Sequence, residues 1–252
     1  MIYRKLPVVL LSVVSTEPAG STNAAIAEFL LSHRSEAATM GVRQLADACT
    51  VGTGSISRFC REVGLVNYAE LQAALSESED VFEQVDGSDV AAAWARGAAG
   101  ALRQAALSVS RPELQQLARE IGARAGVSAF GMLKAETAAM CLQADLLFLG
   151  KRVYTTVAYA DQMAHILSAP ADELLVIFSY TGDYFSYRAL SQEELRCLRR
   201  SEIWMVCPRG VELPDFVSDE VPFDSDGSQL GHPFQLEAVA GLLAQEYAAY
   251  AS

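Results

Sequence analysis

Hydroxyl side chains and a glycine follow an apolar run in residues 177–186, IFSYTGDYFS. Ser179, Thr181 and Gly182 stand where a strand would give way to a helix. Hydroxyls and backbone N–H groups at such a helix N-terminus bind anions, because the helix dipole and the unpaired N–H groups both favour negative charge. We therefore interpret this segment as a candidate anion-binding loop. An ordinary strand-to-helix turn that uses Gly182 is the alternative.

A second loop of this kind is expected in residues 130–137, FGMLKAET, where Gly131 ends an apolar run and Lys134 opens a helix. A cation at a helix N-terminus opposes the helix dipole, and a bound anion would remove the conflict. The hypothesis is that Lys134 pairs with a phosphate or carboxylate of a ligand. A solvated lysine is the alternative.

Residues 224–233, DSDGSQLGHP, follow the last apolar run and could line the same site through Ser225, Ser228 or His232. Asp224 and Asp226 alternate as in a calcium loop, but the motif does not continue. The other histidines lie in helical stretches without acids at ligand spacing, and no cysteine pair has C-x-x-C spacing. We predict no metal, no cofactor and no catalytic residue.

A different chemistry is indicated in residues 50–65, TVGTGSISRFCREVGL. Helical periodicity turns the apolar positions 56, 59, 60 and 63 inward, which leaves polar side chains outward. An arginine and short polar groups near the start of a helix can contact base edges and phosphates of DNA. The candidate DNA-binding residues are Thr53, Ser55, Ser57, Arg58 and Arg61. A helical hairpin with a solvated face is the alternative.

The elements that would position these residues fall into two parts. Residues 1–76 show helical periodicity throughout, and the turn at 50–53 makes two short helices meet at a sharp angle. Residues 77–89 are polar and acidic, and we interpret them as a linker.

Residues 90–252 alternate short apolar runs with amphipathic helical segments, a pattern typical of parallel βαβ units. The predicted fold is therefore an all-helical domain followed by an α/β domain with a doubly wound parallel sheet of five strands. The strand candidates are GVSAFG, RVYTTV, ELLVIFSY, EIWMVC and EVPF. A long helix is expected over residues 184–200.

The formal net charge of −12 is concentrated in two stretches, residues 77–89 and 212–226, which hold six acids each and no Lys or Arg. The acidity therefore lies outside residues 41–66, and DNA binding is not excluded. The apolar run near the N-terminus is interrupted by Pro7 and Ser12, and no stretch reaches the roughly 18 apolar residues of a membrane span. We expect a cytoplasmic protein with no membrane partner.

Residues 41–75, GVRQLADACTVGTGSISRFCREVGLVNYAELQAAL, resemble the N-terminal domain of RpiR-type transcriptional regulators, whose recognition helix carries V-x-R-F-C-R-x-x-G. Thr50 departs from the glycine usual at that turn. In this family the second domain is a sugar isomerase (SIS) fold that senses a phosphorylated sugar, with a Ser-x-Ser-Gly-x-Thr loop. Ser179, Thr181 and Gly182 keep that pattern, whereas Tyr184 replaces the threonine. The first loop keeps Gly131 but lacks the family's second glycine and serine.

The resemblance implies a regulator that binds double-stranded DNA and whose SIS-like domain senses a small anionic metabolite. The expected effector contacts are Gly131, Lys134, Ser179, Thr181, Gly182 and Ser228. A homodimer or a higher homo-oligomer is expected, because a head with few basic groups binds DNA weakly alone. Two alternatives stay open: a sugar-phosphate isomerase using His232 or Glu237 as its base, and a ligand-free dimerisation scaffold.

Overall fold

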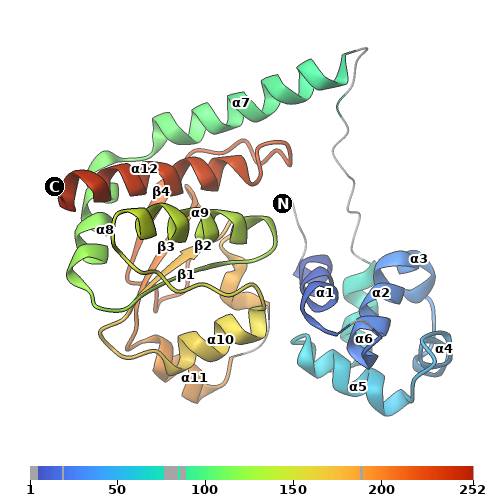
Figure 1. Cartoon of the computed structure of the whole chain (residues 1–252). Coiled ribbons are helices and arrows are strands. Elements are labelled where there is room, and N and C mark those ends of the chain that lie inside the picture. Colours follow the sequence, from blue (N-terminus) through green and yellow to red (C-terminus); the bar gives the residue numbers. More distant parts are fainter. Residues whose placement is uncertain (1–4, 19, 77–84, 86–88, 188–189, 252) are drawn as a thin grey trace. The chain divides into compact units, whose positions relative to one another are not determined.

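The computed structural model describes residues 5–18, 20–76, 85, 89–187 and 190–251. They form two compact units, an N-terminal one that holds helices α1–α6 and a C-terminal one that holds the sheet and helices α7–α12 (Figure 1). Of the acidic linker expected at residues 77–89, only residues 85 and 89 are among those described. Within the described parts of the chain, no helix is both long and apolar enough to cross a membrane.

The N-terminal unit is all helical, as predicted. Its core is made by fully buried apolar side chains, which include Ile26, Leu45, Ile56, Phe59 and Leu71. The helices are α1 (Lys5–Thr16), α2 (Thr22–Ser32), α3 (Arg34–Ala37), α4 (Val42–Ala48), α5 (Thr53–Glu62) and α6 (Tyr68–Ser76).

Two helices of this unit end in the same left-handed turn. After α4, Thr50 has φ 57°, and the N–H of Val51 donates to Ala46 O at 2.9 Å. After α5, Gly64 has φ 84°, and the N–H of Leu65 donates to Cys60 O at 2.7 Å. Both are Schellman caps, which favour glycine because a Cβ is disfavoured at positive φ. Thr50, which stands where glycine is usual, therefore has an unfavourable backbone angle.

The C-terminal unit contains one sheet of four parallel strands in the order β1-β2-β3-β4. Helices α8, α9 and α12 cover one face, and α10 and α11 cover the other (Figure 1). Pro222 is tolerated in β4 because this strand lies at the edge of the sheet. The elements are α7 (Val90–Ser108), α8 (Arg111–Ala123), β1 (Val127–Gly131), α9 (Lys134–Phe148), α10 (Tyr159–Ser168), β2 (Leu174–Phe178), η1 (Asp183–Ser186), α11 (Gln192–Leu198), β3 (Glu202–Pro208), β4 (Asp219–Phe223) and α12 (Phe234–Ala251).

The prediction of five strands was wrong by one, at residues 152–157. This segment makes a single parallel bridge, in which Tyr154 exchanges hydrogen bonds with Val127 O and Ala129 N, both at 2.9 Å. Thr156 O, the next carbonyl expected to face β1, accepts from the side chain of Gln162 instead. With that acceptor engaged, the ladder does not continue.

The long helix expected over residues 184–200 is also absent. A four-residue 3-10 turn, η1, follows the second loop, and α11 begins only at Gln192. Ser191 starts α11 with a capping box. Ser191 Oγ accepts from the Glu194 N–H, and Glu194 Oε2 accepts from the Ser191 N–H. The second loop therefore does not lead directly into an α-helix.

Candidate functional site

Helix α5 turns one face into the core of the N-terminal unit and the other to solvent. Ile56, Phe59 and Cys60 are fully buried, and Val63 is buried just beyond the helix. The outward set is Thr53, Ser57, Arg58 and Arg61, all exposed, together with the half-buried Ser55. The predicted facing of this helix is thus confirmed by burial. The DNA contacts of these five residues stay a prediction.

The two arginines of α5 differ in how they are held. Arg61 Nε donates to Ser57 O at 3.2 Å, so its guanidinium lies along its own helix. Arg58 makes no hydrogen bond or ion pair with any other residue that the structure describes. The carboxylate of Glu62 accepts from Asn23 Nδ2 of α2 at 2.8 Å. Arg58 is therefore the side chain of this helix best able to reach a partner.

The second candidate site lies where the order of the sheet reverses. Gly126 O accepts from Leu174 N, whereas Val127 O accepts from Tyr154 N. Successive carbonyls of a strand point to opposite sides, so β2 and the Tyr154 segment lie on opposite edges of β1. After β1 the chain thus passes first along one edge of this strand, at Tyr154, and then returns along the other edge as β2. Ligands of open α/β sheets bind at such switch points, beside the strands' carboxyl ends.

The loop after β1 keeps the backbone of a glycine loop with only the first of its glycines, Gly131. A Cβ on Gly131 would lie 2.6 Å from the carbonyl group of Ala135, so a side chain is excluded there. Leu133 has φ 53° and ψ −116°, a conformation that normally requires glycine. Leu133 therefore occupies the place of the family's second glycine with a strained backbone. Lys134 follows it and is exposed.

The residue that sequence reasoning missed here is Glu136, in the first turn of α9. Its side chain is only 3% exposed. Oε2 accepts from Gly131 N at 3.1 Å and from Gln162 Nε2 at 2.8 Å, and Oε1 accepts from Thr155 Oγ1 at 2.8 Å. Burial raises the pKa of the Glu136 carboxyl to about 7, although these three hydrogen bonds act to lower it.

The loop after β2 is shaped by tight packing. Gly182 has φ 75°, and a Cβ on it would lie 1.9 Å from Val211 Cγ1, so glycine is needed on both counts. Ser179 is buried and its N–H donates to Val206 O at 3.0 Å. Thr181 Oγ1 accepts from the N–H of Asp183 at 3.3 Å. The hydroxyl of Thr181 therefore serves the turn itself.

Tyr184 links this second loop to the first. Its side chain is buried, and its hydroxyl donates to Gln162 Oε1 at 2.7 Å. Because Gln162 Nε2 also donates to Gly131 O and Glu136 Oε2, both at 2.8 Å, one amide joins the ends of β1 and β2. Tyr184, which stands where the RpiR-type family has a threonine, thus points its side chain into a polar network. No sequence signal marked Gln162.

The loop after β4 reaches the second loop through Ser225. The Tyr180 hydroxyl bonds Ser225 Oγ at 2.7 Å, and it also donates to Gln235 of α12. Ser228 Oγ accepts from the Leu230 N–H within its own loop, at 3.1 Å. Burial lowers the pKa of His232 to about 3, and the charge of Lys134 contributes to the same shift. Lys134 and His232 are therefore close enough to interact electrostatically.

His165 has an acidic partner that sequence spacing did not indicate. Its Nε2 lies 2.8 Å from Glu173 Oε1 and 2.9 Å from Ser128 Oγ, and its ring stacks on Tyr154. These residues lie toward the amino ends of β1 and β2, away from the two loops. Among the described residues, no group of three or more His, Cys, Asp or Glu could hold a metal ion.

Comparisons with known proteins agree with this two-part organisation. Residues 16–80 match the helix-turn-helix domain of the rpiR family. The Vibrio vulnificus NanR protein, solved with ManNAc-6P, aligns over 96% of this chain and 92% of its own at 13% identity, with a TM-score of 0.54. The sugar isomerase domain of an RpiR transcription factor from Sphaerobacter thermophilus covers 65% of this chain and 92% of its own at 18% identity, with a TM-score of 0.50. No curated protein matches the chain significantly.

The fold and the two sites together define a class, a helix-turn-helix domain joined to a parallel α/β domain of the sugar isomerase fold. Residues 16–80 match the helix-turn-helix domain of the rpiR family, and the rest of the chain has a fold similar to that of the sugar isomerase domain solved from Sphaerobacter thermophilus.

Proposed function

We propose that this chain regulates transcription by presenting α5 to the major groove of DNA, while its C-terminal domain binds a small oxyanion such as a sugar phosphate. The DNA contacts would come from Thr53, Ser55, Ser57, Arg58 and Arg61, and the effector contacts from the loops after β1 and β2. The neighbour NanR, solved with ManNAc-6P, supports this class of effector. The effector acts by binding two arrangements of the protein with unequal affinity.

The observation that carries the proposal is the outward face of α5, where Arg58 is exposed and engages no other described residue. A mobility-shift assay with DNA from upstream of the chain's own gene tests it. Binding that weakens steeply with salt, and that Arg58→Ala weakens further, supports the regulator. Absence of binding at low salt would contradict it.

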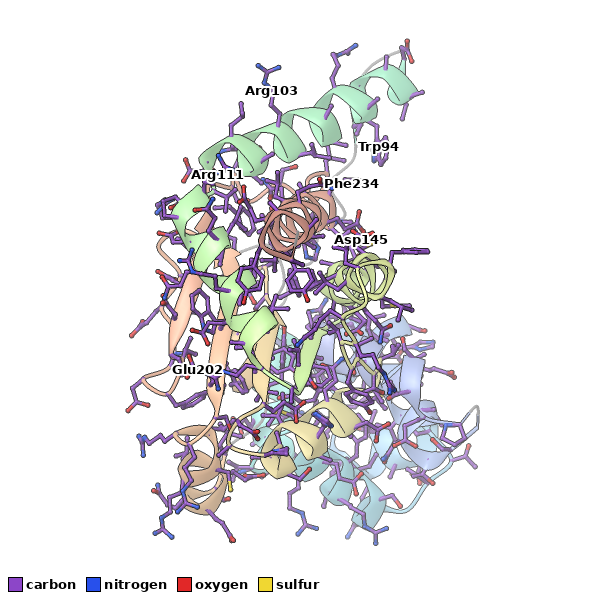
Figure 2. The ribbon with its side chains drawn as sticks, turned by 60° about the vertical axis from the view of Figure 1, so that its left-hand side comes forward. Trp94, Arg103, Arg111, Asp145, Glu202 and Phe234 are labelled. Atoms are coloured by element: carbon purple, nitrogen blue, oxygen red, sulfur yellow. The ribbon has the colours of Figure 1, made fainter. Side chains whose placement is uncertain are left out.

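We propose further that the protein acts as a homodimer, because residues 41–66 carry three arginines against two acids and one such head binds DNA weakly. The surface proposed for the second copy comprises Trp94, Met140, Phe148 and Phe234. Phe148 is 92% exposed, and Trp94 packs edge-on against Phe234. Figure 2 shows Trp94, Phe234 and Asp145 of α9 on one side of the C-terminal unit, opposite Arg111.

Phe148→Glu tests this surface, with Leu107→Glu as its control. Leu107 is 74% exposed and lies near the end of α7, one helical turn after Arg103, whereas Trp94 lies in the first two turns of that helix. Sedimentation should show a dimer for the unchanged protein and for Leu107→Glu, and a monomer for Phe148→Glu. A monomeric unchanged protein, or equal dimerisation of both variants, would contradict the proposal.

A sugar-phosphate isomerase is the second candidate function, and Glu136 is the observation that favours it. A buried carboxyl with a pKa of about 7 at the end of β1 suits a general base. Against it, Oε2 already accepts two hydrogen bonds. We expect no turnover of hexose phosphates. Turnover that Glu136→Gln abolishes would reverse this ranking.

A further inference from the structure

The carboxylate of Glu136, a side chain of the protein itself, is bound in the loop after β1. The backbone N–H of Gly131, at the carboxyl end of β1, donates to Glu136 Oε2 at 3.1 Å. Backbone N–H groups between a strand and the following helix are the donors that oxyanions use in this kind of site. The carboxylate of Glu136 therefore occupies a donor that a ligand in this loop would need.

The surroundings of this carboxylate offer no compensating positive charge. It is faced by the Gly131 N–H from β1, the Thr155 hydroxyl from the segment beside β1, and the Gln162 amide from α10, all neutral. No charged side chain contributes to its shift among the residues that the structure describes.

The other titratable groups near this site lie beyond that shell. Tyr184, from η1, reaches it only through Gln162. Lys134, on α9 itself, is exposed, and its charge acts on His232, which burial holds neutral near pH 7. The charge of a bound oxyanion and the charge of the Glu136 carboxylate would thus lie close together in a buried place, which is strongly unfavourable.

We propose that an oxyanion binds at the loop after β1 together with one proton, which is taken up by Glu136. The proton comes from solvent and bonds to a carboxylate oxygen, so the group loses its charge and becomes a donor. The Gly131 N–H and the new O–H can then both point to the ligand, while Thr155 still donates to the other oxygen. This proposal rests on the proposed function of the C-terminal domain as an anion sensor.

The proposal predicts a dependence of affinity on pH that sulfate can reveal, since sulfate does not titrate near neutrality. The site is competent only when Glu136 is protonated, so the apparent affinity follows the protonated fraction. With a pKa of about 7, affinity should fall about tenfold between about pH 6 and pH 8.

The test is calorimetric titration of the full chain with sulfate, with the amide resonance of Gly131 followed by NMR to locate binding. In the unchanged protein, buffers of different ionisation enthalpy should report about one proton taken up per sulfate at about pH 8. Glu136→Gln should bind equally at both pH values, and Glu193→Gln, a change at an exposed acid of α11, should behave as the unchanged protein.

Three results would overturn the proposal: a flat pH dependence without proton uptake, the same dependence in Glu136→Gln, or no sulfate-induced change at Gly131. Proton uptake needs no variant, so a poorly folded Glu136→Gln does not leave the matter open. DNA binding by the same preparations is measured separately. Absence of DNA binding would contradict the proposed regulatory function, whereas the sulfate results test only the role of Glu136.

Discussion

The hydroxyl of Tyr184 donates a 2.7 Å hydrogen bond to Gln162 Oε1, and this contact ties the turn after β2 to helix α10. Both side chains are buried. The amide of Gln162 is thereby oriented, with its Nε2 toward Gly131 O and Glu136 Oε2. One tyrosine thus helps to position the polar groups at the ends of two strands.

Tyr184→Phe should destabilise the C-terminal unit by about 1–3 kcal/mol, because it leaves Gln162 Oε1 buried without its donor. Both tryptophans, Trp94 and the buried Trp204, belong to this unit, so urea unfolding followed by tryptophan fluorescence reports it selectively. Tyr154→Phe is the control, since Tyr154 is 46% exposed. Equal midpoints for the two variants would show that the hydrogen bond contributes little.

Thr50→Gly should stabilise the N-terminal unit by roughly 1 kcal/mol, because threonine at φ 57° carries a steric cost that glycine lacks. Gly64→Ala should destabilise it by a similar amount, since Gly64 has φ 84° in the matching turn. Hydrogen exchange of the amides of α4 and α5 in the full chain measures both changes. A gain from Gly64→Ala would contradict this account of the turns.

Arg58→Ala and Arg61→Ala should weaken DNA binding in different ways. Arg58 engages no other described residue and can reach a base edge, so its loss should cost about 1–3 kcal/mol and reduce sequence discrimination. Arg61 lies along α5, and as a phosphate contact its loss should lower the salt slope by about 1 without altering discrimination. Titrations of matched and mismatched DNA at several salt concentrations separate the two.

Glu136→Gln should make the C-terminal unit more stable above about pH 7. The folded-state pKa of this acid is raised from 4.5 to about 7, so the unfolded chain releases its proton first as pH rises. Stability therefore falls between those values, by about 3 kcal/mol in total at 1.36 kcal/mol per pKa unit. The variant removes this loss, and its advantage should shrink toward pH 4.5.

Urea unfolding by tryptophan fluorescence across this pH range gives the comparison. Glu193→Gln, at an exposed acid, should follow the unchanged protein. If Glu136→Gln shows the same loss of stability between about pH 5 and pH 7, the cost of ionising the buried carboxyl has been assigned to the wrong residue.

Much of the fold could be predicted from local patterns. Apolar spacing predicted the inward face of α5, because Ile56, Phe59 and Cys60 recur at the helical period and are all buried. Gly64 predicted the end of that helix. The runs that became β1, β2 and β3 were recognisable because strands buried on both faces are mostly apolar, and the edge strand β4 was recognisable from its short apolar run EVPF. Residues 152–157 looked the same but bridge β1 only at Tyr154.

The candidate effector site was predicted only in part. The requirement for Gly131 and Gly182 could be predicted from the sequence, because close packing at both positions and a positive φ at Gly182 favour glycine. Glu136, Gln162 and Tyr184 form the network that joins the loops, yet they lie far apart in the chain. An acid in the first turn of a helix is ordinary by sequence, because it favours the helix dipole.

The sequence by itself therefore determined the helices of the N-terminal unit, four of the five expected strands, where two glycines are required, and which side of α5 is polar, since each depends on neighbours within a few residues. Only the tertiary structure decided the number of strands, the switch point beside β1 and the burial of the Glu136 carboxyl. Those depend on which distant groups satisfy each hydrogen bond, and on how much water the packing of β1, α9 and α10 removes from a charge.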